Sequence, residues 1–209
     1  MAGLVVGDDV DGVTSLVFAG VIGAVLVVLG FAAASRCRIL TQRSNTQRVR
    51  LHVLTLAVGA GVGLVNLAAN WGIAEADPAL RTLLAERMAR LAPRPWETLF
   101  AGPITEEVAF RLFVMSGIAW LVYRATKSAR VAFVVALIGS AVVFAFPHLE
   151  RPMPDDPMLA DVYRAALLTK YTLLGVPLGW VFWRWGLPYA ILCHSAANAT
   201  HMVLESVVF

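Results

Sequence analysis

Long apolar runs separated by short polar segments dominate the chain. The runs cover residues 14–35, 51–74, 97–123, 131–149, 165–184 and 187–208. Each is close to the roughly 20 residues that a helix needs to cross the hydrocarbon of a bilayer. Backbone groups inside a bilayer must pair within their own segment, so the runs are predicted to be helices. The pattern predicts an all-α fold, a polytopic transmembrane helical bundle of about six spans.

Two connecting segments differ from the short links. Residues 75–96 have leucines at helical spacing with four arginines around them, which predicts an amphipathic helix on the membrane surface. Residues 150–161 hold three prolines and are predicted to form an irregular aqueous loop. Gly59, Gly61 and Gly63 lie within the second run, where small residues let neighbouring helices approach closely.

Composition supports a membrane protein. The 209 residues are 59% hydrophobic and 15% charged, with a mean hydropathy of +0.73, which argues against a soluble domain. The net charge is +3, but the basic residues gather between the apolar runs, so no nucleic-acid partner is expected. Cys37 and Cys193 have no spacing typical of a disulfide framework or metal site. We expect an integral, multi-pass protein of the cell membrane, with the lipid bilayer as a partner.

The charges outside the runs predict an orientation. Asp8, Asp9 and Asp11 precede the first run without any Lys or Arg, so that run is predicted to be a retained span and not a cleaved signal. Basic residues are more numerous on the side of the 36–50 link, which the positive-inside rule makes cytoplasmic. Both termini are then expected outside.

Three charges inside the third run need an explanation. A charged side chain at the bilayer centre costs about 2.5–3.5 kcal/mol on insertion scales, so such groups usually face a protein interior. Glu107 and Arg111 are four residues apart with the acid first, which favours an ion pair. Glu106 projects about 100° away around the helix and stays available. If Pro103 is the first helical residue, both acids also lie near the positive end of the helix dipole.

Later runs carry further polar groups. His148 follows Phe144 by four residues, and His194, Asn198 and His201 form one stripe of the last predicted helix. A single ion pair or a lone buried histidine is more often structural. Together, a carboxylate, imidazoles and an amide on three spans are what a buried water-activating site needs. His201 extends the stripe by one turn, and either a supporting or a purely structural role fits it.

Three motifs resemble a known family. The segments Glu106–Arg111, Phe144–His148 and His194–Asn198 fit EExxxR, FxxxH and HxxxN in that order. They look like the motifs of the CPBP family of intramembrane proteases, which includes the CAAX prenyl endopeptidases, and the resemblance covers about residues 97–201. We therefore expect residues 1–96 to form two N-terminal transmembrane helices, the basic link and the surface helix. Residues 97–209 are expected to form a four-helix catalytic core.

The resemblance implies an endopeptidase acting on a membrane-embedded or lipidated substrate, for example a prenylated CAAX terminus. It implies that Glu106 is the general base and that His148 positions the water. His194 and Asn198 would donate to the oxyanion, with Glu107 and Arg111 in support. The chain has no HExxH motif. Glu106, His148 and His194 could nevertheless hold one zinc ion, and the same residues also suit a mechanism that requires no cofactor.

Two other function classes fit the same residues. Acids and histidines within spans also mark proton-coupled transporters and channels, although the sequence has no inverted repeat of the kind typical of that class. A non-catalytic scaffold that binds partner helices is the other alternative. The predicted orientation places the start of the third span outside, whereas a CAAX-type role needs cytoplasmic access.

Overall fold

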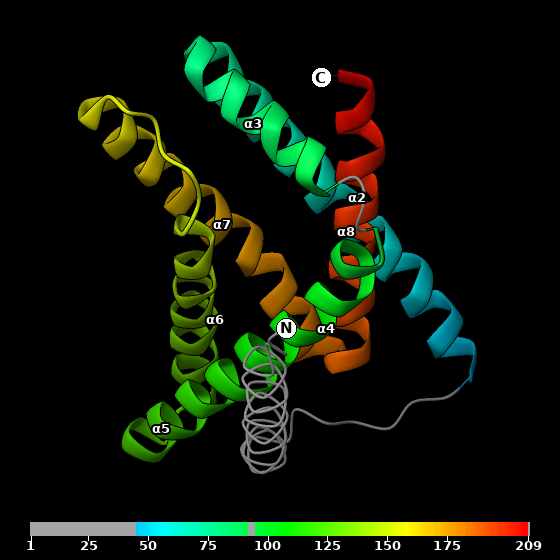
Figure 1. The fold of residues 1–209 in the computed structure, drawn as a ribbon. Coiled ribbons are helices and arrows are strands. Elements are labelled where there is room, and N and C mark those ends of the chain that lie inside the picture. Colours follow the sequence, from blue (N-terminus) through cyan, green and yellow to red (C-terminus); the bar gives the residue numbers. More distant parts are fainter. Residues whose placement is uncertain (1–44, 92–94, 209) are drawn as a thin grey trace, which may run out of the picture.

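The structure, a computed structural model, describes residues 45–91 and 95–208, and they are almost entirely helical. Figure 1 shows the helices crossing as a bundle. No strand occurs within these two ranges, which confirms the predicted all-α fold. The predicted first span, 14–35, lies outside the described residues. The described elements are α2 (Asn45–Ala76), α3 (Pro78–Leu91), η1 (Glu97–Ala101), α4 (Gly102–Glu106), η2 (Glu107–Met115), α5 (Ser116–Thr126), α6 (Ala129–Ala145), η3 (Phe146–Leu149), α7 (Pro157–Trp185) and α8 (Leu187–Val208).

Four described helices are long and apolar enough to cross a membrane. They are Val49–Ala76, Glu97–Thr126, Ala129–Leu149 and Pro157–Trp185, and they match the second to fifth predicted runs. The sixth run is the 22-residue helix α8, which is not among the four. Of the five predicted runs that lie within the described residues, four therefore form helices long and apolar enough to span a membrane. The chain is an integral membrane protein with a helical bundle.

The third span is one continuous helix with two widened segments. Segments η1 and η2 are π-helical, with α4 between them, and π-bulges of this kind are frequent at functional sites. Residue 95 is already helical. Pro103 is therefore not its first residue, and the predicted placement of Glu106 and Glu107 near the positive end of the helix dipole is wrong.

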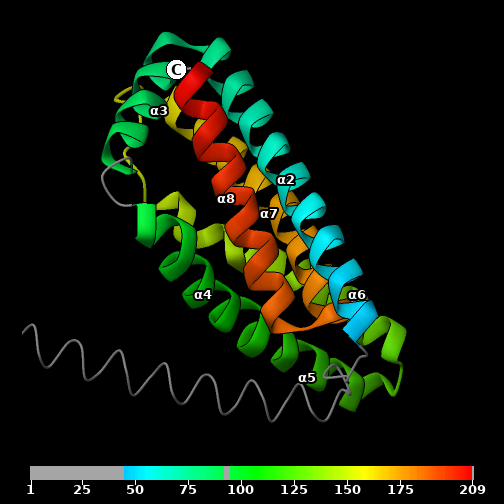
Figure 2. The ribbon, with the colours of Figure 1, turned by 90° about the vertical axis from the view of Figure 1, so that its right-hand side faces the viewer.

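Helices α2 and α8 pack along each other (Figure 2). A Cβ atom at Gly59 would collide with the carbonyl oxygen of Cys193, and one at Gly63 would lie 2.5 Å from that of Ala197. Gly61, between them, faces open space. The predicted role of this glycine segment in close helix packing is confirmed at Gly59 and Gly63, and the contact positions α8 at the residues that flank His194 and Asn198.

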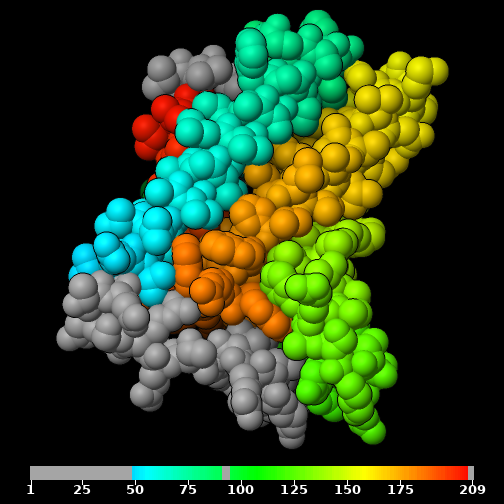
Figure 3. Space-filling model, turned by 180° about the vertical axis from the view of Figure 1, so that it is seen from behind, coloured from blue at the N-terminus to red at the C-terminus, as the bar shows by residue number. Residues whose placement is uncertain are grey.

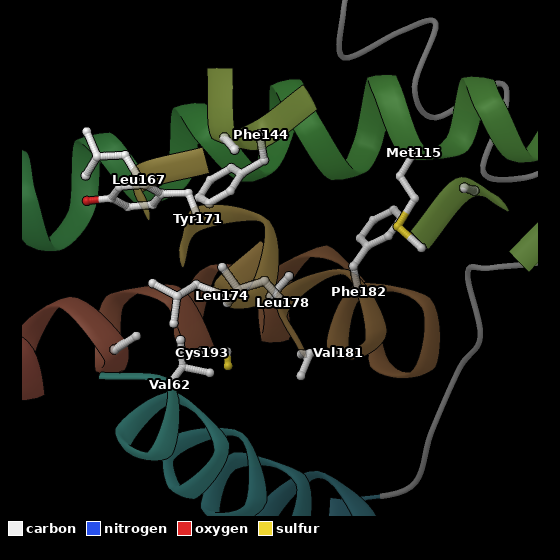
Figure 4. Close-up of a cluster of buried hydrophobic side chains, with 14 of the residues drawn as sticks. Val62, Met115, Phe144, Leu167, Tyr171, Leu174, Leu178, Val181, Phe182 and Cys193 are labelled. Atoms are coloured by element: carbon white, nitrogen blue, oxygen red, sulfur yellow. The ribbon is translucent and has the colours of Figure 1, made fainter. Parts of the chain in front are cut away.

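The apolar core lies between α2, α6, α7, α8 and the third span. Seen from behind, α2 and α7 lie side by side over this core (Figure 3). Figure 4 shows Phe144 and Tyr171 together at one end of the core cluster, and Met115 with Phe182 at the other. Cys193 is buried in the same cluster, as expected for a small apolar filler. The end of the core with Phe144 and Tyr171 borders the candidate site.

Two predicted boundaries need correction. The loop predicted over 150–161 ends earlier, because Asp156 caps α7 by accepting hydrogen bonds from the backbone N–H groups of Met158 and Leu159. The amphipathic segment 75–96 does form helix α3, but Leu80 and Leu84 on its apolar face are buried within the protein. That face therefore packs on the bundle itself.

Candidate active site

A cavity of 620 Å³ lies between the helices, and it brings distant parts of the sequence together. Its lining includes Glu106 from α4, His148 from η3, and His194 and Asn198 from α8. These are the four residues to which the sequence analysis assigned catalytic roles. The volume lies within the range of about 300–1,000 Å³ that is usual for small-ligand sites.

Glu107 and Arg111 form a buried ion pair, and neither residue lines the cavity. Arg111 Nε lies 3.2 Å from Glu107 Oε2, and both side chains have no exposed surface. The Arg111 guanidinium also lies over the Phe144 ring, 4.8 Å from its centroid. The predicted pairing is thus present in the structure. Since both charges are removed from solvent, each depends on the other for compensation.

Glu106 has a different environment from its neighbour. Its side chain is 33% exposed, and it lines the cavity. Its buried Oε2 atom has no hydrogen-bond partner among the residues that the structure describes. The nearest ionisable partner atom is His194 Nε2, at 3.7 Å, which is too long for a hydrogen bond. Glu106 therefore lines the cavity and has one carboxylate oxygen to which no described residue donates a hydrogen bond.

His194 bridges the two adjacent acids. Its Nδ1 atom lies 2.9 Å from Glu107 Oε1, and its Nε2 atom faces Glu106. With Glu107 accepting a hydrogen bond from Nδ1, the ring is held in one orientation. The Phe144 ring packs edge-on against the imidazole at a centroid distance of 6.0 Å. The buried pair of Glu107 and Arg111 thus fixes the position of a histidine that lines the cavity.

His148 is held at the end of α6 by a backbone group. Its Nδ1 atom lies 2.9 Å from the carbonyl oxygen of Phe144, which belongs to the last turn of the helix and lacks a helical N–H partner there. Because a carbonyl can only accept, Nδ1 donates and Nε2 is left as the acceptor nitrogen of the neutral ring. Tyr171 stacks on the imidazole with ring centroids 3.9 Å apart.

Asn198 links α8 to the start of the third span. Its Nδ2 group donates to the carbonyl oxygen of Thr98 at 2.8 Å. In the π-helical register of η1, Gly102 N–H bonds to Glu97 O, so the next N–H toward Thr98 would come from residue 103. That residue is Pro103, which has no N–H to donate. The asparagine amide supplies a donor to this carbonyl instead.

His201 belongs to a second polar cluster, which the sequence analysis did not find. Asn70 Nδ2 lies 2.9 Å from His201 Nε2 and donates to Glu205 Oε1 at 2.8 Å. Lys170 Nζ donates to Asn70 Oδ1 at 2.6 Å. All four side chains are buried. The cluster connects α2, α7 and α8, and charged residues in apolar runs were the only sequence signal for it.

Two arginines of the cavity lining were also missed. Arg87, from α3, and Arg151, from the loop before α7, both line the cavity. The Arg151 guanidinium lies over the Tyr171 ring, 4.7 Å from its centroid. Tyr171 is the residue that stacks against His148. Burial lowers the pKa of the Arg151 guanidinium, and the nearby charge of Arg87 lowers it further. The sequence signal for Arg87 was ambiguous, since arginines surround α3 on several sides.

The conditional zinc set is not arranged as a metal site. Across residues 45–91 and 95–208, no group of three or more His, Cys, Asp or Glu side chains is placed to hold a metal ion. Glu106, His148 and His194 line one cavity. Nδ1 of His148 contacts a backbone carbonyl and Nδ1 of His194 contacts Glu107, so only the Nε2 atoms of the two histidines could bind a metal. The geometry therefore lends no support to a metalloprotease.

Comparison with known proteins gives one match. A protein-family model described as "Type II CAAX prenyl endopeptidase Rce1-like" matches residues 90–200, which is more than half of the chain. Searches among curated proteins and among solved structures find no match. The matched region contains the three motifs and the four cavity residues that they supply.

Proposed function

The chain belongs to the Rce1-like family of type II CAAX prenyl endopeptidases, and on this basis we propose that it hydrolyses peptide bonds with a water molecule activated by Glu106. The family implies a CAAX-type intramembrane protease in general. The observation that carries the proposed mechanism is the contrast between two adjacent acids. Glu107 is fully buried and forms ion pairs with Arg111 and His194, whereas Glu106 is 33% exposed and lines the cavity.

The proposed first step is attack of water on the scissile carbonyl. Glu106 takes a proton from the water while the water oxygen bonds to the carbonyl carbon. The π electrons of the C=O bond move to the carbonyl oxygen, which becomes the oxyanion. His148 Nε2 accepts the second water hydrogen in a hydrogen bond and so orients the nucleophile. The protonated Glu106 then gives its proton to the leaving amine as the C–N bond breaks. The glutamate returns to its starting state.

His194 and Asn198 are the proposed donors to the oxyanion. Since Nδ1–H of His194 donates to Glu107, this histidine donates to the oxyanion through Nε2–H in its doubly protonated form, with the Glu107 carboxylate beside it. The Asn198 amide has a second N–H besides the one that bonds Thr98. Donors placed at an oxyanion contribute about 2.7–4 kcal/mol each where they have been removed by mutation. Both residues are held by contacts that exist before any substrate binds.

The proposed substrate is a membrane-embedded or lipidated peptide or protein. A prenylated C-terminal Cys-aliphatic-aliphatic-X sequence is the first candidate, because the family description names such substrates. The apolar residues Val62, Leu174 and Leu178 line the cavity together with the polar groups. The site can therefore accept the aliphatic side chains of such a substrate.

A cleavage assay tests the proposal directly. We expect the full-length protein in lipid vesicles to cleave an S-farnesylated peptide ending in Cys-aliphatic-aliphatic-X. Glu106→Gln should lower the rate by at least about 100-fold, which is the lower range for loss of a general base. Glu75→Gln serves as a matched control, because Glu75 is an exposed acid paired with Arg81.

Two results would contradict the proposal. A Glu106→Gln protein that cleaves at the wild-type rate would remove Glu106 from the mechanism. A folded wild-type protein that cleaves none of a panel of prenylated, acylated and unmodified peptides would favour a scaffold. Proton flux through vesicles that depends on Glu106, without any cleavage, would favour a transporter or channel.

A further inference from the structure

The cavity has a positively charged end that the proposed chemistry does not use. Arg87 and Arg151 both line it, and Nη1 of each is buried without a hydrogen-bond partner among the described residues. Neither guanidinium forms an ion pair with a carboxylate from the described ranges. Two like charges in the lining of one cavity, each with a buried unpaired N–H, form an unfavourable arrangement unless an anion binds between or beside them.

The other charged groups nearby do not supply that anion. Lys170 and Glu205 are connected through Asn70, by hydrogen bonds of 2.6 and 2.8 Å, so this pair is compensated within its own cluster. Glu97, an acid that also lines the cavity, is exposed. Arg90 is exposed too and lies 3.9 Å from Glu86. Glu106 lines the same cavity, but its ion-pair contact is with His194 and not with either arginine. Among the described residues, Arg87 and Arg151 therefore have no carboxylate in direct contact.

Aromatic stacking connects this positive end to the catalytic residues. The Arg151 guanidinium lies over Tyr171, and Tyr171 stacks on His148. A ligand bound by Arg151 is thus held in a fixed relation to the histidine that is proposed to orient the water. Stacking on an aromatic face also leaves the edge of a guanidinium free to bind a carboxylate with two hydrogen bonds.

We propose that Arg87 and Arg151 bind the free C-terminal carboxylate of the substrate peptide. This inference rests on the proposed function, because it places a peptide between the arginines and Glu106. A short C-terminal segment spans at most about 3.3–3.6 Å per residue, so binding of the chain end fixes which peptide bond reaches Glu106. The enzyme would select peptides by the position of the bond relative to the terminus.

Paired peptides with different C-termini test this role. One S-farnesylated sequence is prepared as the free acid and as the C-terminal amide, and kcat/KM is measured for both with the full-length protein in neutral lipid vesicles. We expect the acid to be cleaved at least about tenfold more efficiently, since a hydrogen bond to a charged group is lost with the amide. The ratio of the two values is independent of the fraction of folded enzyme.

Arginine variants complete the test. Arg87→Gln and Arg151→Gln should reduce the acid-to-amide ratio toward one, mainly by lowering the value for the acid. Arg151→Lys should restore part of the ratio. Arg164→Gln is the control, because Arg164 is an exposed arginine paired with Asp161, and it should leave the ratio unchanged.

The outcomes separate this inference from the proposed function. Equal cleavage of acid and amide by the wild-type protein, with both lost in Glu106→Gln, would overturn the carboxylate site and leave the protease intact. If the arginine variants lower kcat/KM equally for the acid and the amide, and only in vesicles with anionic lipids, the arginines bind a lipid headgroup and the inference is wrong. Absence of all cleavage would overturn both proposals.

Discussion

The Nδ2 atom of Asn198 donates a hydrogen bond of 2.8 Å to the carbonyl oxygen of Thr98, five residues before a proline. One side chain thereby satisfies a carbonyl that lacks the N–H of Pro103 and joins α8 to the third span. The same amide is the proposed oxyanion donor. Its structural and chemical roles can be separated by substitution.

Asn198→Asp should destabilise the protein more than Asn198→Ala does. The carboxylate would place an acceptor against the Thr98 carbonyl, whereas alanine only removes the donor. We expect alanine to lose about 0.5–1.5 kcal/mol with this part-buried hydrogen bond and the carboxylate to lose more, measured by thermal unfolding in detergent. Ser206→Ala, an exposed position on the same helix, is the control. An Asn198→Asp protein as stable as the wild type would contradict this account.

The buried pair of Glu107 and Arg111 should show strong coupling in a double-mutant cycle. Glu107→Gln keeps the shape of the side chain and an acceptor for His194, but it leaves the Arg111 charge uncompensated. Removing one partner of a buried pair typically costs about 3–5 kcal/mol.

The double variant, Glu107→Gln with Arg111→Met, should therefore be less destabilised than the sum of the single variants. Its stability is measured by the same unfolding assay, and its folded fraction should have reduced cleavage activity because His194 loses its charged partner. Strictly additive losses would show that the two side chains do not depend on each other.

The glycines of α2 give a matched set of substitutions. Gly59→Ala and Gly63→Ala should each weaken the contact with α8, since the added Cβ would press on its backbone or on the Thr200 side chain. Overpacking of this kind costs about 1–3 kcal/mol. Gly61→Ala meets no described atom within 4 Å, and it should be neutral or slightly stabilising. Equal effects at all three positions would rule out close packing as the reason for the glycines.

Metal dependence can be tested without any variant. The proposed mechanism uses Glu106 as a base, so activity should persist after exhaustive dialysis against a strong chelator. The measurement is the cleavage rate before and after dialysis, with zinc added back as the second arm. Loss of activity that zinc restores would favour the alternative in which Glu106, His148 and His194 hold a metal ion.

The sequence predicted the features that depend on local pattern. Hydropathy located the helices, and the spacing of Glu107 and Arg111 predicted their ion pair, because both signals repeat with the period of a helix. Each of the three motifs contributes residues to one cavity, although Glu107 and Arg111 of the first motif do not line it. The π-helical segments were not predicted, since a shift from four to five residues per hydrogen bond leaves the apolar pattern almost unchanged.

Residues that meet only through tertiary packing were missed. Asn70 and Glu205 are 135 residues apart, and neither belongs to a motif with a recognisable spacing. In the sequence, nothing distinguishes Arg87 from the other arginines of α3, and Arg151 lies in a proline-rich segment where an exposed charge is expected. Their approach to the cavity depends on how α3 and the loop after η3 pack on the bundle, which no local signal in one sequence encodes.

The contact of α2 with α8 affects how far the chain can be shortened before the proposed site is disturbed. The family match begins at residue 90, after α2 has ended, yet Gly59 and Gly63 bear on α8 at Cys193 and Ala197, each next to a proposed catalytic residue. A fragment cut to the boundaries of the match would keep every motif and lose the surface against which His194 and Asn198 are set. The segment that identifies the family is therefore shorter than the segment that the proposed site needs to hold its residues in place.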